Sequence, residues 1–302
     1  MSTVALLGAG RMGSAMVGRL LGGGHHVRVW NRSREPVDAL LAAHPGRDLL
    51  AARTPEEAVV GTVLVISVLA DAAATESVIT DQVLAAMPPG AVLCDMATSG
   101  VATAERLAAR VAAHERGYVD APVSGSVASV DSGELLVMAS GDEALVRQIA
   151  PVLASFAAEV LRVGPVGAGQ AMKLAVNLVV HHLNAAVSDA LLLAEAAGIA
   201  PETAYDVLER SAVAAPFVRY KRAAFLDHDA PTAMSLALVA KDLSLVRDYA
   251  RELGLAHKVT DAVLAQVRHA VDAGWGDRDM ARLRVASVTR AGGPGAARNQ
   301  EV

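Results

Sequence analysis

The chain has 302 residues, and at about 150 residues per domain this length predicts two domains or one large one. Lys and Arg number 27 and Asp and Glu number 32, so the net charge is −5 with His neutral. This mild acidity argues against broad electrostatic binding to nucleic acid. Three Phe, two Trp and four Tyr leave an aliphatic core and too few rings for a platform that stacks single-stranded bases.

The single cysteine, Cys94, excludes an intrachain disulfide and any zinc site that needs several thiolates. The first residues show no signal-peptide pattern, and the most apolar stretch, 58–70, is too short to span a bilayer. The histidines show no ligand spacing, so we expect no resident metal. These features predict a cytoplasmic protein with neither a nucleic-acid nor a membrane partner.

Residues 1–163 alternate short apolar runs with helical patterns. Strands are expected at 3–7, 27–30, 62–68, 92–96, 118–121, 135–139 and 160–163. Met12, Met16 and Leu20 recur every four residues and indicate a helix after the first strand. Thr54 followed by Pro55 has the form of a helix start. The alternation predicts an α/β fold with a doubly wound, Rossmann-type parallel sheet as a dinucleotide-binding domain.

The pattern changes after Gly164. Residues 170–197 contain no helix breaker, and Gly198 is a natural residue to follow a helix end. From there to about residue 286 the chain has the pattern of helices joined by short turns. We therefore expect an all-α substrate and dimerisation domain over 164–290 that begins with a long helix. Residues 291–302 are rich in Gly, Ala and polar residues and are expected to form a disordered tail.

A glycine-rich loop follows the first predicted strand and opens the first helix. The residues are Gly8-Ala9-Gly10-Arg11-Met12-Gly13, which fit G-x-G-x-x-G. In such a loop the first glycine makes a tight turn, the second lets the backbone approach a pyrophosphate, and the third lets helix and strand pack. The helix N-terminus offers N–H groups to the phosphates. Glycines also occur in ordinary turns, but the strand–glycine–helix–strand context favours a dinucleotide site.

The end of the second strand bears on the choice of dinucleotide. Sites for NAD commonly have Asp or Glu there to bind the ribose 2′-hydroxyl, whereas this chain has Asn31-Arg32-Ser33. A guanidinium and a hydroxyl suit a 2′-phosphate. The alternative is a solvated loop arginine, and Arg34 could share the role. We expect NADP(H) to be favoured over NAD(H).

Two further segments carry candidate chemistry. Residues 120–126 form a loop of small residues after a strand, whose N–H groups could bind an anion with the Ser124 hydroxyl, although on the local sequence alone an ordinary turn is the preferred explanation. Lys173 follows a glycine loop in the first turn of the long helix, where the helix dipole disfavours a cation. Asn177 shares its helical face. Lys241 and Asp242 are charges inside an apolar helical run.

Taken in order, five segments resemble the β-hydroxyacid dehydrogenase family, which includes 3-hydroxyisobutyrate dehydrogenases and glyoxylate/succinic semialdehyde reductases. They are 8–13, 95–99, 120–125, 164–177 and 241–243, and the resemblance extends over roughly 3–286. It implies an N-terminal domain like the NAD-binding domain of 6-phosphogluconate dehydrogenase, followed by a helical domain that often dimerises. A homodimer or homotetramer is the expected assembly.

The resemblance also implies roles for individual residues. Those that would hold the cofactor diphosphate are Gly8, Gly10, Met12 and Gly13, and Arg11 would also bind the cofactor. The adenosine 2′-phosphate would lie against Asn31, Arg32 and Ser33, and the rest of the cofactor against Leu69, Ala70, Thr98 and Lys241. The residues implied for substrate binding are Ser124, Gly125, Ser126, Met234 and Lys241. Lys173 would be the general acid/base, and Asn177 would orient the substrate.

Some positions depart from the family pattern. Ser126 replaces a usual glycine, and Met234 stands where an aromatic residue is frequent. These residues leave the reductase class intact but do not indicate 3-hydroxyisobutyrate as the substrate. The expected reaction is hydride transfer between NADP(H) and a small anionic β-hydroxy acid, semialdehyde or 2-oxo acid.

Three alternatives are weighed against this expectation. Imine reductases share the architecture but usually have Asp or Tyr at the position of Lys173. A 6-phosphogluconate dehydrogenase is disfavoured by the short helical domain. A catalytically silent dinucleotide-binding scaffold is disfavoured by the presence of Lys173 and Asn177 together.

Overall fold

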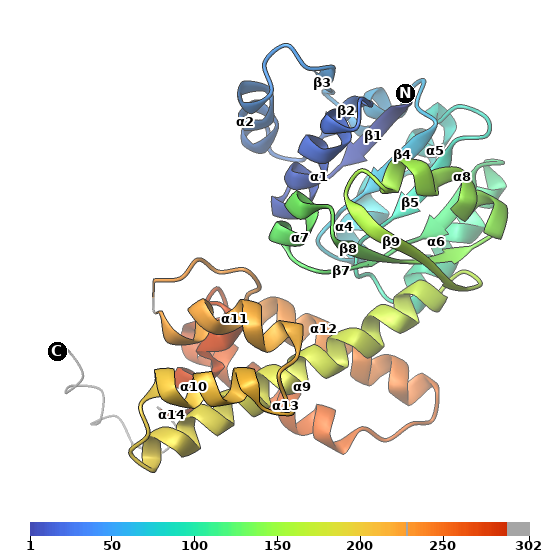
Figure 1. The fold of residues 1–302 in the computed structure, drawn as a ribbon. Helices are drawn as coiled ribbons and strands as arrows, with labels where there is room; N and C mark the ends of the chain where they lie inside the picture. The colour runs from blue at the N-terminus through green and yellow to red at the C-terminus, as the bar shows by residue number, and fades with distance from the viewer. Residues whose placement is uncertain (228, 289–302) are drawn as a thin grey trace. The chain divides into compact units, whose positions relative to one another are not determined.

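The computed structural model describes residues 1–227 and 229–288, so the expected tail at 291–302 lies outside the described residues. Contacts divide the chain into two compact units, Met1–Lys173 and Leu174–Val302 (Figure 1). The predicted division before Gly164 falls ahead of the long helix, whereas the break in the contacts lies within that helix, after Lys173.

The first unit is the expected α/β domain. Its strands are β1 (Thr3–Leu7), β2 (His26–Trp30), β3 (Leu49–Ala51), β4 (Leu64–Ser67), β5 (Val92–Asp95), β6 (Gly117–Asp120), β7 (Val123–Ser124), β8 (Leu135–Gly141) and β9 (Ala157–Gly164). Its helices are α1 (Arg11–Gly22), α2 (Glu35–Ala43), α3 (Pro55–Val59), α4 (Ala72–Val78), α5 (Asp81–Ala86), α6 (Val101–Ala113), α7 (Val127–Ser132) and α8 (Glu143–Leu153). The predicted fold class is confirmed, and β3 and β7 were missed because they are only three and two residues long.

The sheet is mixed rather than wholly parallel. Its order is β3-β2-β1-β4-β5-β6-β8-β7, with β9 paired to β8. The strands from β3 to β6 are parallel, as expected. The expectation is wrong for β8, which pairs antiparallel with β6 and β7. The connection from β6 to β8 contains only β7 and the six-residue α7, too little for the long crossover that a parallel neighbour needs.

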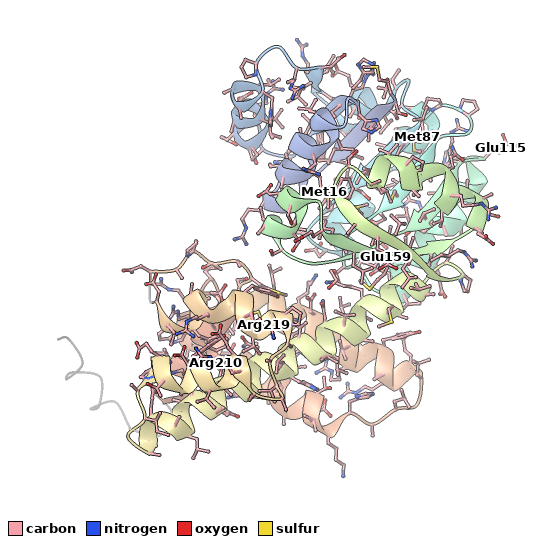
Figure 2. All side chains as sticks on the ribbon, in the orientation of Figure 1. Met16, Met87, Glu115, Glu159, Arg210 and Arg219 are labelled. Atoms are coloured by element: carbon pink, nitrogen blue, oxygen red, sulfur yellow. The ribbon has the colours of Figure 1, made fainter. Side chains whose placement is uncertain are left out.

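Helices cover both faces of the sheet, so each central strand is buried on both sides. Leu6 packs in a cluster with α1 and α8, whereas the next residue, Leu7, packs in a cluster with α3, α5 and α6. Met16 and Met87, labelled in Figure 2, lie one in each cluster and are almost wholly buried. Continuous apolar runs such as β4 are therefore needed here, since both side-chain directions lead into a core.

Local signals in the sequence account for several helix ends. Thr54 Oγ1 accepts a hydrogen bond from the Glu57 N–H at 3.2 Å, so Thr54 is the N-cap of α3, as expected. Asp71, Thr80 and Asp142 cap α4, α5 and α8 in the same way. Each cap satisfies an N–H group that the helix itself leaves without a partner.

The second unit is helical throughout its described part. It contains the C-terminal part of α9 (Ala168–Ala196), then α10 (Pro201–Arg210), α11 (Pro216–Leu226), α12 (Leu236–Glu252), α13 (Lys258–Ala270) and α14 (Leu283–Val288), with shorter turns at Val271–Trp275 and Met280–Arg282. Its core contains Leu191, Tyr205 and Leu243 from three of these helices. The only β pairing among its described residues is one isolated bridge between Ser235 and Asp279.

The long helix α9 has a property that the sequence reasoning did not anticipate. It is the one described helix that is long and apolar enough, by length and composition, to cross a membrane. The same test is passed by core helices, and α9 buries polar side chains at Asn177, His181, Asn184 and Ser188. Two of these bond within the second unit, Asn177 to Asp242 and Asn184 to the Met280 carbonyl. One face of α9 is therefore packed into the second unit through polar contacts, while 39% of its most apolar window is buried.

A buried ion pair ties together three segments of the second unit. Lys221 Nζ lies 2.8 Å from both carboxylate oxygens of Asp279, and both residues are less than 5% exposed. Asp279 also accepts from the N–H groups of Ala233, Met234 and Ala281 at 2.8, 3.2 and 3.0 Å. Burial alone would raise the pKa of Asp279, but Lys221 and these N–H donors outweigh it and lower that pKa. The pair therefore fixes the backbone at Met234.

We predict that Lys221→Met lowers the free energy of unfolding by about 3 kcal/mol at pH 7, because it leaves a buried carboxylate without its cation. The lowered pKa of Asp279 means that its contribution is present at neutral pH and is lost as the pH falls through the folded-state value. In the variant, burial without Lys221 favours the protonated carboxyl. The gap between wild type and variant should thus narrow as the pH is lowered.

Urea unfolding at a series of pH values measures both effects. The matched control is Arg34→Met, which removes the exposed pair between Arg34 and Asp38 and should change stability by less than about 1 kcal/mol. Equal losses in the two variants, or a gap that widens in acid, would contradict the role assigned to Lys221.

Candidate functional site

The glycine loop after β1 is shaped by the protein's own packing at two of its three glycines. Gly8 has φ +108°, and its N–H donates to the Trp30 carbonyl at 2.8 Å. A Cβ at Gly8 would lie 2.4 Å from the Val68 carbonyl oxygen, and one at Gly13 would lie 1.9 Å from the Gly8 carbonyl oxygen. Neither position can accept a side chain, so Gly8 and Gly13 are explained without a ligand.

At Gly10, in contrast, the protein itself leaves the space open, so this position shows whether a dinucleotide could approach the loop. A Cβ at Gly10 would meet no protein atom within 4 Å. Gly10 is the N-cap of the twelve-residue α1, which has no side-chain cap and no acidic residue in its first turn. An open approach to a helix N-terminus that has no side-chain cap is the environment that a diphosphate requires. Arg11 is exposed and Met12 half-buried beside it, so the residues here fit the group.

The end of β2 is tied to this loop by one of the predicted cofactor residues. Asn31 Oδ1 accepts from the Ala9 N–H at 3.0 Å, and its Nδ2 donates to the Ser33 carbonyl and to Ser33 Oγ, both at 3.0 Å. The Asn31 side chain thus shapes the loop. Arg32 and Ser33 are exposed next to it, and Arg34 pairs with Asp38 at 2.8 Å. The basic group available at the end of β2 is therefore Arg32, which lies where the sequence predicted a 2′-phosphate contact.

The loop after β4 lies against Gly8 of the glycine loop. The Leu69 Cδ2 atom would be 3.2 Å from a Cβ at Gly8, and Leu69 is half-buried. Ala70 follows it and is exposed. Both were predicted to line the cofactor cleft, and the contact with Gly8 brings Leu69 to the glycine loop.

The loop after β5 is held by a residue that the sequence reasoning missed. Gln170, on α9, is fully buried; its Oε1 accepts from the N–H groups of Ser99 and Gly100 at 3.2 and 3.1 Å, and its Nε2 donates to the Ala97 carbonyl at 2.8 Å. Thr98, predicted to lie near the nicotinamide, is half-buried in the middle of this loop. Gln170 therefore fixes the backbone that carries Thr98.

A buried carboxylate at the end of β6 fixes Gln170 in turn. Asp120 accepts from Ser140 Oγ and, at 3.1 Å each, from the N–H groups of Gly167 and Gln170. A Cβ at Gly169 would lie 2.8 Å from Asp120 Oδ2, so the helix start approaches the sheet without a side chain between them. Burial raises the pKa of Asp120 although these hydrogen bonds oppose the shift. Asp120 joins β6, β8 and the start of α9.

The neighbouring strand end carries a second buried carboxylate. Asp95 lies in register with Asp120, and its Oδ1 accepts from Ser67 Oγ at 2.7 Å and from the Ala97 N–H at 3.3 Å. Burial raises the pKa of Asp95 to about 6, against those two bonds and with a small contribution from Asp120. The adjacent Cys94 is also buried, which raises the pKa of its thiol and keeps it protonated. Asp95 and Cys94 support the site from inside the sheet.

The predicted substrate loop follows Asp120. Ser124 ends β7 and is half-buried, Gly125 is exposed with φ +138°, and Ser126 is the N-cap of α7. The Ser126 N–H donates to Ser129 Oγ at 3.1 Å, so a substrate carboxylate would compete with Ser129 for this donor. The structure therefore makes Ser124 the stronger candidate for a direct contact.

Lys173 lies one turn after Gln170 on α9 and is half-buried. Because Asp120 and Gln170 fix the start of this helix, they also fix the position from which the Lys173 side chain extends. Among the 302 residues only four are lysines, at 173, 221, 241 and 258. Lys221 is bound to Asp279 and Lys258 is exposed.

The remaining predicted residues belong to the second unit. Asn177 is 5% exposed, and its Nδ2 donates to Asp242 Oδ2 at 2.8 Å. Lys241 Nζ lies 3.1 Å from Asp242 Oδ1. The buried carboxylate of Asp242 therefore brings Asn177 and Lys241 together. Met234 is half-buried, packs against the helical core and is fixed through its backbone by Asp279.

No group of three or more His, Cys, Asp or Glu residues within 1–227 and 229–288 could hold a metal ion. The site residues that the sequence did not predict are Asp95, Asp120, Gln170 and Asp242, each in its supporting role. The three Asp residues lay inside motifs that were noted, but their partners are distant in the sequence and could not be deduced from it.

Comparison with known proteins gives two family matches that together cover most of the chain. Residues 3–164 match the family described as the NAD binding domain of 6-phosphogluconate dehydrogenase. Residues 167–286 match the family described as NAD-binding of NADP-dependent 3-hydroxyisobutyrate dehydrogenase. The chain is 30% identical to glyoxylate/succinic semialdehyde reductase 1 of Arabidopsis thaliana over 282 residues, which are 93% of this chain and 96% of that protein.

Solved structures agree with these matches. A 3-hydroxyisobutyrate dehydrogenase of Mycobacterium tuberculosis with L-serine superposes with a TM-score of 0.83 at 29% identity, covering 95% of this chain and 99% of that one. An imine reductase from Pseudomonas sp. has a lower TM-score, 0.62, at 26% identity over 95% of this chain and 99% of that one.

We predict that Gln170→Met, which has nearly the same shape, lowers the free energy of unfolding by about 2 to 3 kcal/mol, because two buried N–H groups and one carbonyl lose their partner. Urea unfolding measures the loss. The matched control is Gln148→Met, since Gln148 is exposed and bonds weakly to the Gly90 carbonyl at 3.5 Å. If Gln170→Met were as stable as this control, the hydrogen bonds of Gln170 would not be what holds loop 97–100 in place.

Proposed function

The chain belongs to the β-hydroxyacid dehydrogenase family, and from this premise we propose that it is an NADP(H)-dependent reductase or dehydrogenase of a small β-hydroxy acid or its semialdehyde. Lys173 is its general acid/base. The nicotinamide, when bound, supplies or accepts a hydride at the carbonyl carbon. The protein's own residues bind the anionic groups, orient the substrate and move the proton.

The preference for NADP(H) rests on the end of β2. No acidic residue follows this strand within Asn31-Arg32-Ser33 to accept the hydrogen bonds of a ribose 2′-hydroxyl. The guanidinium of Arg32 is exposed there, with the loop around it braced by Asn31. Arg binds phosphate with two parallel hydrogen bonds, which makes it suited to a 2′-phosphate. The family description of the second half of the chain, which names an NADP-dependent enzyme, supports the same preference.

The proposed reaction rests on how the backbone around Lys173 is held in place. Its side chain extends from the start of α9, which hydrogen bonds of Asp120 hold against the sheet. It lies one turn after Gln170, whose side chain bonds to the loop that carries Thr98. Twenty-three of the 27 basic residues are Arg, which cannot give up a proton in a protein, so a lysine at this position suits proton transfer. An ammonium group at the carbonyl oxygen stabilises the charge that develops there and then supplies the proton.

The substrate is a small anion in this proposal. The Ser124 hydroxyl and neighbouring loop groups bind its carboxylate, Asn177 orients it, and Lys241 adds positive charge. Met234 stands where relatives often have an aromatic ring, so it sets the size of the substrate that is accepted. Glyoxylate, succinic semialdehyde and L-serine enter as candidates through the names of the relatives.

The assembly and the compartment belong to the same proposal. Val179 and Leu193 on α9 are 61% and 74% exposed, and apolar side chains on a long helix suit the homodimer or homotetramer expected from the family. The single buried cysteine suits a reducing, cytoplasmic setting.

A substrate panel with Lys173 variants tests the reaction. We expect wild type to turn over at least one of glyoxylate, succinic semialdehyde, methylmalonate semialdehyde, tartronate semialdehyde or L-serine. Lys173→Ala should lose about 100-fold or more in kcat. Lys173→Arg should be similarly impaired, because a guanidinium keeps the charge but does not release the proton.

Lys258→Ala is the matched control, since Lys258 is exposed, and it should retain wild-type activity. Turnover of a cyclic imine in place of every carbonyl compound would favour the imine reductase alternative. Binding of NADPH without turnover of any substrate would favour the silent scaffold. Carbonyl turnover that survives in Lys173→Ala would overturn the role of Lys173.

The cofactor preference is tested with Arg32→Ala. We expect kcat/KM for NADPH to fall about 10-fold to 100-fold, because charge-assisted hydrogen bonds to the 2′-phosphate are lost, and kcat/KM for NADH to stay nearly constant. Arg47→Ala, which removes another exposed loop arginine, should leave both values unchanged. A wild-type enzyme that prefers NADH would refute the assignment.

A further inference from the structure

The second unit holds a buried polar group that we call the Asp242 cluster, made of Asn177, His181, Lys241 and Asp242. Asp242 lies at its centre and is 4% exposed. Its Oδ2 accepts from Asn177 Nδ2 at 2.8 Å, and its Oδ1 lies 3.1 Å from Lys241 Nζ. Two residues with proposed roles in the reaction are therefore held by one carboxylate.

His181 is the member that neither the family resemblance nor the proposed reaction explains. Its side chain is wholly buried, and its Nε2 lies 3.5 Å from Asp242 Oδ2. Neither ring nitrogen has a hydrogen-bond partner of good geometry among the described residues. Buried polar atoms in native proteins nearly always have partners, so an imidazole that faces a carboxylate at this distance needs an explanation. Because N–H···O hydrogen bonds are about 2.7 to 3.2 Å long, Nε2 would have to come only a few tenths of an ångström closer to donate to Asp242.

The charges around Asp242 show what His181 contributes. Burial alone would raise the pKa of Asp242, but His181 and Lys241 outweigh it and lower that pKa. The ionisable groups that act on this carboxylate are His181 from α9 and Lys241 from its own helix α12. His182 is the next residue in the chain, and its pKa is lowered by burial first and then by His181 and His257. Asp242 therefore stays ionised despite its burial.

An ionised Asp242 determines how Asn177 is oriented. A carboxylate only accepts hydrogen bonds, so it binds the NH₂ end of the Asn177 amide and leaves the carbonyl end on the other side. A protonated Asp242 could donate instead, and the amide could then bind in either orientation. The state of Asp242 thus controls a residue four positions along α9 from Lys173.

We propose that His181 is a positioning residue, whose imidazole donates to Asp242 and so keeps this carboxylate in the form and orientation that align Asn177 and Lys241 with the substrate. The inference rests on the proposed function for its effect on turnover. The link between His181 and Asp242 is independent of that function and is measured separately below.

Kinetics of three variants test the effect on turnover. We expect His181→Leu, which removes the donor, to lower kcat/KM about tenfold at pH 8, equivalent to about 1.4 kcal/mol. The loss should be greater at pH 6, because an Asp242 without its donor from His181 takes up a proton at higher pH. His181→Gln offers an N–H at the position of Nε2 and should restore most of the activity and the wild-type pH profile.

His182→Leu is the matched control, since it replaces the adjacent histidine on a different face of α9 and should leave kcat/KM and its pH profile unchanged. Unchanged profiles in His181→Leu, or a loss in His181→Gln as large as in His181→Leu, would show that His181 only fills space.

An NMR titration of the full-length chain tests the link without any substrate. We expect the carboxyl carbon of Asp242 to titrate at higher pH in His181→Leu than in wild type, and the ring nitrogens of His181 to change their shifts in Asp242→Asn. Identical titrations would overturn the proposal even for an active enzyme. If wild type turned over no substrate while the titrations shifted as expected, the proposed function would fail and the His181–Asp242 link would stand. Should His181→Leu not fold, His181→Gln and Asp242→Asn still decide the question.

Discussion

The carboxylate of Asp120 is the constraint on which the first unit's site depends. It lies at the end of β6, accepts from Ser140 on β8, and binds the N–H groups of Gly167 and Gln170 where α9 begins. Gln170 then fixes loop 97–100, and Lys173 follows one turn later on the same helix. One acidic side chain thereby sets the spacing between the loop that carries Thr98, the substrate loop after β6 and the proposed acid/base. The nearby Asp95 is fully buried in the same sheet edge, and this burial raises its pKa to about 6.

Two further buried carboxylates hold segments together in the second unit, but their partners include basic side chains. Asp120 is bound by N–H and hydroxyl groups, whereas Asp242 faces Lys241 and His181, and Asp279 pairs with Lys221. A buried carboxylate can accept several hydrogen bonds at once, so it joins segments that are distant in sequence. Asp242 organises polar side chains that take part in the proposed reaction, and Asp279 organises the backbone around Met234. The net charge of −5 therefore includes buried carboxylates that hold segments of the chain together and do not contribute to the surface charge.

Much of the fold could be predicted because its signals are local. The apolar run of β4, the cap at Thr54 and the glycine after α9 each depend on a few neighbouring residues, and each is found where expected. The direction of β8 was not predicted, because strand direction depends on how a connection returns to the sheet. For the site, the glycine loop and the proximity of Leu69 to Gly8 agree with the motif, whereas the anchoring of Ala9 by Asn31 assigns that side chain a task that no motif stated.

The sequence by itself determined the α/β class, the helical second half, the glycine loop and the family resemblance, because these depend on periodicity, spacing and residue type. Only the tertiary structure decided which side chains hold the site in place. Gln170 bonds to residues about 70 positions away, Lys221 to Asp279, and Asn177 to Asp242. The physical reason is that a buried polar group must find its partner wherever the packed chain brings one, and that partner leaves no mark on the local pattern. His181 is the clearest example. As one of two adjacent histidines it gave no functional prediction, and its proposed role comes only from its position beside the buried carboxylate of Asp242.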